Sequence, residues 1–336
     1  MLLVDSTLLR PVDAEQGYLA SLVGDGRPLL ALGAVALLAS GLFAWFLAVT
    51  DQLLPHDLAW LTITPADLRA IADGRLVHFM AHDRAAFGGT LIAIGVLYLW
   101  LIRFPLAEGR RWAWWTVAGS TLIGFLSFLS YLGTGYLDSW HGVATLALLP
   151  VFGFGLAMTR RLLRNSGPAD DGGTRRLDGR ATAGRWLLLL TGFGMLIAGL
   201  TIVTIGTFVV FVPQDLEYIG LDKAALDALD PRLVPLIAHD RSGFGGGLAT
   251  TGLVVLACVW FGRPSRALWQ ALGLAGMAGF GAAIGVHGLV GYLDLTHVGP
   301  AILGAWIFIA GMVLVRPAMH RRRELPAATV RTEVPA

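Results

Sequence analysis

The chain has 336 residues, of which 55% are apolar and only 14% are charged, and its mean hydropathy is +0.67. A soluble domain is about one-quarter charged, so this composition excludes an ordinary water-soluble protein and predicts one embedded in a lipid bilayer. The formal net charge of +2 gives no indication of a nucleic-acid partner, and the single cysteine, Cys258, excludes a disulfide within the chain.

Eight apolar runs without charged side chains follow one another, each near the ~20 residues that a helix needs to cross a bilayer. They cover residues 29–50, 85–102, 112–137, 142–159, 186–214, 242–262, 267–293 and 298–315. Continuous apolar runs favour helices, because a transmembrane β-barrel would show alternating polarity. The sequence therefore predicts an all-α integral membrane protein with eight transmembrane helices.

The placement of arginine and lysine predicts the orientation. With the N-terminus inside, the cytoplasmic segments hold 19 of the 25 Lys and Arg residues, so both termini are expected inside a bacterial-type cytoplasmic membrane. The sequence predicts a cytoplasmic leader at residues 1–28 and a four-helix repeat at 29–159. A cytoplasmic linker follows at 160–185, then a second four-helix repeat at 186–315 and a cytoplasmic tail at 316–336. In the first outer loop, Thr64, Pro65 and Asp67 predict the start of a short helix, and residues 221–229 predict a matching one.

The sequence repeats itself at a nearly constant spacing. AHDRAAFGGTL at residues 81–91 returns as AHDRSGFGGGL at 238–248, and GYLDSWH at 135–141 returns as GYLDLTH at 291–297. Upstream, Pro55 and Asp57 are echoed by Pro213 and Asp215. The pattern predicts two tandem four-helix repeats of parallel topology.

The repeated residues are charged or can coordinate a metal, and all are expected at the outer membrane level. They are His82, Asp83, Arg84, Asp138 and His141, with their twins His239, Asp240, Arg241, Asp294 and His297. Ionisable residues in membrane segments are functional candidates by default. His287 is interpreted as a buried structural histidine.

His82 and His239 each stand at the top of a helix face of small residues, which allows a flat group to come close. A porphyrin fits between His82 and His141, and a second between His239 and His297, with Arg84 and Arg241 holding propionates. Asp83 or Asp138 can orient a ligating imidazole through its second nitrogen.

This layout resembles the heme A synthase family, in which histidines enter the second, fourth, sixth and eighth of eight helices. The separations of 59 residues for His82–His141 and 58 for His239–His297 carry the resemblance. The resemblance implies heme b held by one histidine pair in each half. Position 79 is phenylalanine where that family has a glutamate.

Three functions remain open at this stage. The first is a heme-binding redox protein, an oxidoreductase if it is an enzyme, which transfers electrons or oxidises a quinol or another lipophilic substrate. The second is a non-heme enzyme that holds an Fe, Mn or Zn ion in the repeated His/Asp cluster, with Asp83, Asp138, Asp240 and Asp294 as candidate catalytic or ligating groups. The third is a non-enzymatic transporter or assembly factor in which the polar cluster is a structural latch.

Overall fold

The computed structural model describes residues 23–136, 139–164 and 178–320, and within those ranges the chain is helical with no β-strand. Eight helical spans in this part of the chain are long and apolar enough to cross a membrane. The first four are α2 (Arg27–Val49), α5 (Arg75–Arg103), α6 (Arg111–Ser127) with its continuation, and α8 (Ser139–Arg164). The next four are α9 (Gly179–Phe208), α12 (Leu233–Phe261), α13 (Arg266–Val290) and α14 (Leu295–His320).

We call residues 23–164 the N-terminal half and residues 178–320 the C-terminal half. The continuation of α6 consists of η3 (Phe128–Ser130) and α7 (Tyr131–Thr134). The predicted leader, linker and tail lie partly outside the described residues.

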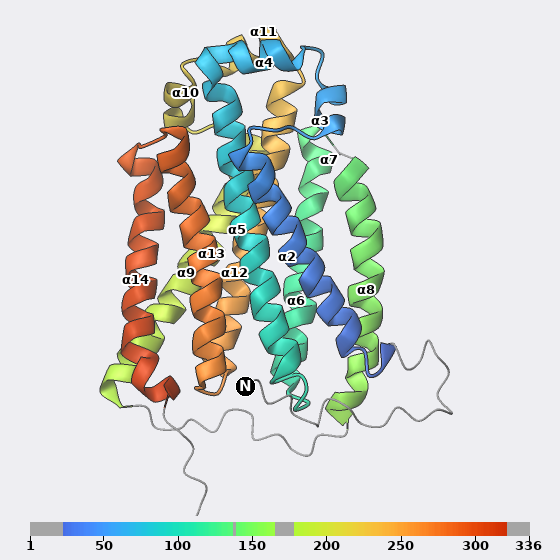
Figure 1. Cartoon of the computed structure of the whole chain (residues 1–336), viewed down its shortest axis with the longest axis vertical. Helices are drawn as coiled ribbons and strands as arrows, with labels where there is room; N and C mark the ends of the chain where they lie inside the picture. The colour runs from blue at the N-terminus through green and yellow to red at the C-terminus, as the bar shows by residue number, and fades with distance from the viewer. Residues whose placement is uncertain (1–22, 137–138, 165–177, 321–336) are drawn as a thin grey trace, which may run out of the picture.

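Short helices cover one end of the bundle, which we call the cap end (Figure 1). They are α3 (Pro55–Trp60), α4 (Pro65–Ala70), η2 (Ile71–Gly74), α10 (Pro213–Ile219) and α11 (Lys223–Leu229). As the sequence predicts, Thr64 caps α4 by accepting a hydrogen bond from the backbone N–H of Asp67. The Asp222 side chain caps α11 in the same way.

The helices α5 and α12 form the centre of the bundle. In the most apolar 18-residue stretch of each span, 72% of the residues are buried for α5 and 61% for α12, against 28% or less in the other six spans. α5 packs on α2 and α12 packs on α9. A Cβ on Gly88 would lie 2.7 Å from the Gly41 carbonyl oxygen, and one on Gly199 would lie 2.6 Å from that of Gly245, so these pairs let the backbones approach closely.

The two halves are interleaved. α5 of the N-terminal half packs on α13, and α12 of the C-terminal half packs on α6. Each central helix therefore lies against the third span of the other half, and neither half encloses its own polar residues.

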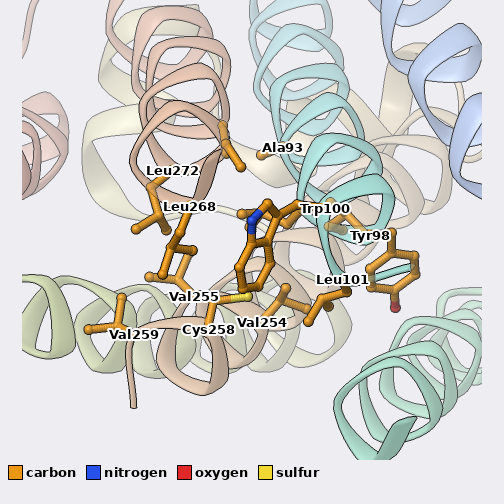
Figure 2. Close-up of a cluster of buried hydrophobic side chains, with 14 of the residues drawn as sticks. Ala93, Tyr98, Trp100, Leu101, Val254, Val255, Cys258, Val259, Leu268 and Leu272 are labelled. Atoms are coloured by element: carbon orange, nitrogen blue, oxygen red, sulfur yellow. The ribbon is translucent and has the colours of Figure 1, made fainter. Parts of the chain in front are cut away.

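Two apolar clusters bracket the polar layer. Near the C-terminal ends of α5 and α12, Trp100, Leu101, Val254 and Cys258 belong to a buried cluster that also includes residues of α13 (Figure 2). A second cluster lies under the cap and includes Phe79. The His-Asp-Arg motifs are placed between these clusters, away from water.

Candidate functional site

The repeated motifs lie inside helices, not at their ends. α5 begins at Arg75 and α12 at Leu233, so the segments 82–84 and 239–241 are nearly two turns into their helices and are largely buried. The expectation that these residues open their helices was wrong, because a charge-free run marks only the part of a helix without buried charges. In this protein ion pairs partly compensate the charges within the helix.

Arg84 binds two carboxylates, one from each half. Its Nε donates to Asp240 Oδ2 at 2.8 Å, and its Nη2 donates to Asp57 Oδ2 at 2.8 Å. Asp240 comes from α12 and Asp57 from the cap helix α3. The Tyr136 hydroxyl donates to the second oxygen of Asp57 at 2.7 Å.

Arg241 makes the reciprocal set of contacts. Its Nε donates to Asp83 Oδ2 at 3.3 Å, and its Nη1 donates to Asp215 Oδ2 of α10. The Tyr292 hydroxyl donates to Asp215 Oδ1 at 2.9 Å. Burial and the neighbouring carboxylate of Asp215 raise the pKa of Tyr292 above its ordinary value, so this phenol stays a donor.

The ionic layer carries an unbalanced charge. Two guanidiniums, Arg84 and Arg241, face four carboxylates, those of Asp57, Asp83, Asp215 and Asp240, which leaves a formal charge of −2. Charge buried away from water is costly unless it is compensated. The layer therefore has a formal excess of negative charge that a nearby cation would offset.

The histidines pair across the halves. His82 lies against His297, with 5.6 Å between ring centroids, and His239 lies against His141, with 4.8 Å between centroids. The expected axial pairs, His82 with His141 and His239 with His297, were wrong, because α5 and α12 each turn their histidine toward the opposite half.

A third histidine completes the cluster around His82. His82, His287 and His297 each offer one ring nitrogen, and these atoms all lie within 4.8 Å of one another. His82 Nε2 and His287 Nε2 are 3.1 Å apart. Two nitrogen ligands of a tetrahedral ion, at about 2.0–2.1 Å from it, lie about 3.3 Å apart, so this spacing is close to that of a metal site.

The Nδ1 atoms of His287 and His82 each have a hydrogen-bond partner, and this partner determines whether Nδ1 carries a hydrogen. His287 Nδ1 faces the carbonyl oxygen of Ala283 at 2.6 Å, and His82 Nδ1 faces Asp83 Oδ1 at 3.1 Å. A carbonyl and an ionised carboxylate only accept, so both Nδ1 atoms donate, and in neutral imidazoles both Nε2 atoms then present lone pairs to each other. Two lone pairs at 3.1 Å repel unless a proton or a cation lies between them.

The cluster of the other half differs at one position. Tyr131 occupies the place in the repeat that His287 has in the C-terminal half, and its ring centroid lies 3.8 Å from that of His239. His239 Nδ1 faces the Tyr136 carbonyl at 3.2 Å, so His239 Nε2 accepts from His141 Nδ1 at 3.2 Å. The contact between His239 and His141 therefore has the geometry of an ordinary hydrogen bond with one donor and one acceptor.

The remaining predicted residues have other roles. Arg84 and Arg241, expected to hold propionates, bind carboxylates of the protein. Asp83 orients His82, as expected, whereas Asp240 pairs with Arg84. Asp294 accepts from the Thr296 hydroxyl and the His297 backbone N–H at the start of α14; the Thr296 hydrogen bond is the main reason that its pKa is lowered. Asp138 lies outside the described residues.

Each histidine cluster borders a cavity. The first, of about 390 Å³, lies among α2, α5, α6, α8 and α12 and is lined by His141 and His239. The second, of about 790 Å³, lies among α5, α9, α12, α13 and α14 and is lined by His82, His287 and His297. Apolar side chains form most of both linings.

Several important residues escaped the sequence analysis. His287 was interpreted as a buried structural histidine, and Tyr131, its equivalent in the repeat, was not considered. Asp57 and Asp215 were visible as a repeated Pro-x-Asp pattern, and Tyr136 and Tyr292 lie inside the repeated GYLD segment. For these four residues the repeat was the available signal. The repeat does not show that α5 and α12 each pack against the opposite half.

Fold and site together define a class: a helical protein with eight membrane-length spans, a buried ionic layer and two histidine clusters. Comparison with protein-family models, with curated proteins and with solved structures gives no match.

Proposed function

We propose that the chain is a metal-dependent membrane enzyme whose ion is held by His82, His287 and His297. The observation that supports this proposal most strongly is the approach of two Nε2 atoms to 3.1 Å beside a third imidazole. A divalent cation there removes the repulsion and offsets the formal charge of −2 in the ionic layer. Imidazole ligands suit Zn²⁺, Cu²⁺, Fe²⁺ or Ni²⁺.

The surrounding residues support metal binding. The hydrogen bonds from His82 to Asp83 and from His287 to Ala283 hold both rings by their second nitrogen, as partners of ligating histidines commonly do. Arg241 in turn positions Asp83. A bound ion supplies Lewis acidity or a redox couple, and three protein ligands leave a coordination position open toward the second cavity. The proposed substrate is therefore a lipophilic molecule in that cavity.

We also propose the arrangement in the membrane. The chain is a tandem duplication of two four-helix units of parallel topology, and both termini face the cytoplasm. Retention of the same motifs at a near-constant spacing supports the duplication, and the placement of arginine supports the orientation. The cap and the histidine clusters then lie toward the outer face.

Heme b is the second candidate, because the second cavity, at about 790 Å³, is within the range of cofactor sites and three histidines line it. A porphyrin plane has no room between nitrogens 3.1 Å apart, so a heme there requires a single histidine ligand or separation of the rings.

The test is metal analysis of the purified protein beside His287→Gln, with an absorption spectrum of each sample. Wild type is expected to carry one transition ion per chain without a Soret band, and the variant is expected to lose it. His78→Gln is the matched control, since His78 is half exposed and lies 3.7 Å from Asp51. Equal metal content in wild type and His287→Gln refutes the site, and a Soret band selects heme.

A further inference from the structure

The first cavity is long and narrow. Along α5 its lining runs from Arg84 through Phe87, Leu91 and Ile94 to Tyr98. Fourteen residues of α-helix extend about 21 Å. Such a slot is long enough for an extended hydrocarbon chain.

The cap end of this slot holds an unused hydrogen-bond donor. Arg84 lines the cavity and is only 9% exposed, and its Nη1 has no hydrogen-bond partner. Thr250, another lining residue, also holds a buried oxygen without a partner. A buried polar atom without a partner is destabilising, more so where water is absent. An acceptor oxygen on a bound molecule would give Arg84 Nη1 the hydrogen-bond partner that it lacks.

The charges around Arg84 decide which oxygen fits. Its single positive charge is shared between Asp57 and Asp240, so the group already carries a formal charge of −1. A third carboxylate is disfavoured there by repulsion, whereas a neutral carbonyl oxygen accepts the hydrogen bond without adding charge.

We propose that this cavity binds a long-chain molecule with a neutral carbonyl head group, the carbonyl at Arg84 and the chain directed toward Tyr98. The first cavity shares no lining residue with the second, so the proposal is independent of the metal site. The tandem halves then differ in chemistry. The C-terminal cluster with His287 takes a cation, and the N-terminal cluster with Tyr131 borders a lipid slot.

The experiment is native mass spectrometry of the full chain in detergent with two probes of the same chain length, methyl palmitate and palmitate. Gly124→Leu fills the first cavity, since a Cβ there has only Thr250 Oγ1 within 4 Å, at 3.7 Å. Gly279→Leu is the matched control, because it fills the second cavity where a Cβ meets nothing within 4 Å. Gly124→Ala provides a smaller change that preserves folding.

Wild type is expected to bind one methyl palmitate and to bind palmitate at least tenfold more weakly. Gly124→Leu is expected to weaken methyl palmitate binding at least tenfold, Gly124→Ala by a smaller factor, and Gly279→Leu by less than twofold. Equal binding of both probes by wild type overturns the assignment of a neutral head group. Wild-type affinity in Gly124→Leu, or equal loss in Gly279→Leu, overturns the site.

Discussion

Replacing Arg241 by methionine tests the ionic layer. The change removes the guanidinium from two buried carboxylates, those of Asp83 and Asp215, and from the Val210 carbonyl, to which Nη1 donates at 2.8 Å. Breaking a buried pair on one side leaves an uncompensated charge, which costs about 3–5 kcal/mol. We expect the free energy of unfolding of Arg241→Met to fall by at least this amount, because two carboxylates lose their partner.

The assay is unfolding by sodium dodecyl sulfate in dodecyl maltoside micelles, followed by circular dichroism. Glu108→Gln is the control, because the exposed pair of Glu108 with Arg110 is worth about 0–1 kcal/mol. The double variant Arg241→Met, Asp83→Asn should recover about 1–3 kcal/mol of the loss, since it removes one unpaired charge. If Arg241→Met is no less stable than Glu108→Gln, the layer does not hold the halves together.

Three further results are expected. Tyr136→Phe and Tyr292→Phe should each lower the free energy of unfolding by about 1.5–3 kcal/mol in the same assay, because each removes a hydrogen bond to a buried carboxylate; unchanged stability contradicts their role. Expressed alone, the N-terminal half should aggregate, and co-expression with the C-terminal half should restore a monodisperse complex on a gel-filtration column, because Asp83 and Arg84 of α5 pair with Arg241 and Asp240 of α12. In the cap, burial raises the pKa of Asp230, but the backbone donors of Arg232, Thr62 and Ile63 outweigh burial and leave the pKa below its ordinary value. The stabilisation from Asp230 is therefore fully present above an unfolded pKa of about 3.9 and is lost as the pH falls through the lower folded value. Pepsin cleavage near residues 61–63 should rise as the pH falls below about 3.9. Asp230→Asn should abolish this rise in cleavage at acid pH.

The sequence predicted the spans well, because a helix in lipid needs an apolar run of known length. The exceptions are residues 75–84 and 233–241. Both segments were left out of their helices because charged side chains there look incompatible with lipid. Their compensation comes from residues far away in the chain, such as Asp240 for Arg84.

The candidate residues were found through the repeat, but their partners were not. A repeat shows which positions are equivalent and not which half supplies each contact. His82 was expected to pair with His141 and instead meets His287 and His297. The site depends on the crossing of α5 and α12, which is a property of packing between halves. Differences between the copies, such as Tyr131 in place of His287, are as informative as the conserved motif.

X-ray absorption spectroscopy at the metal edge, on protein purified with its native ion, measures the ligands of that ion. We expect about three imidazole nitrogens at about 2.0–2.1 Å from a single ion. The metal site is refuted by a porphyrin pattern of scattering, by a shell of oxygen ligands only, or by an ion retained unchanged in His287→Gln.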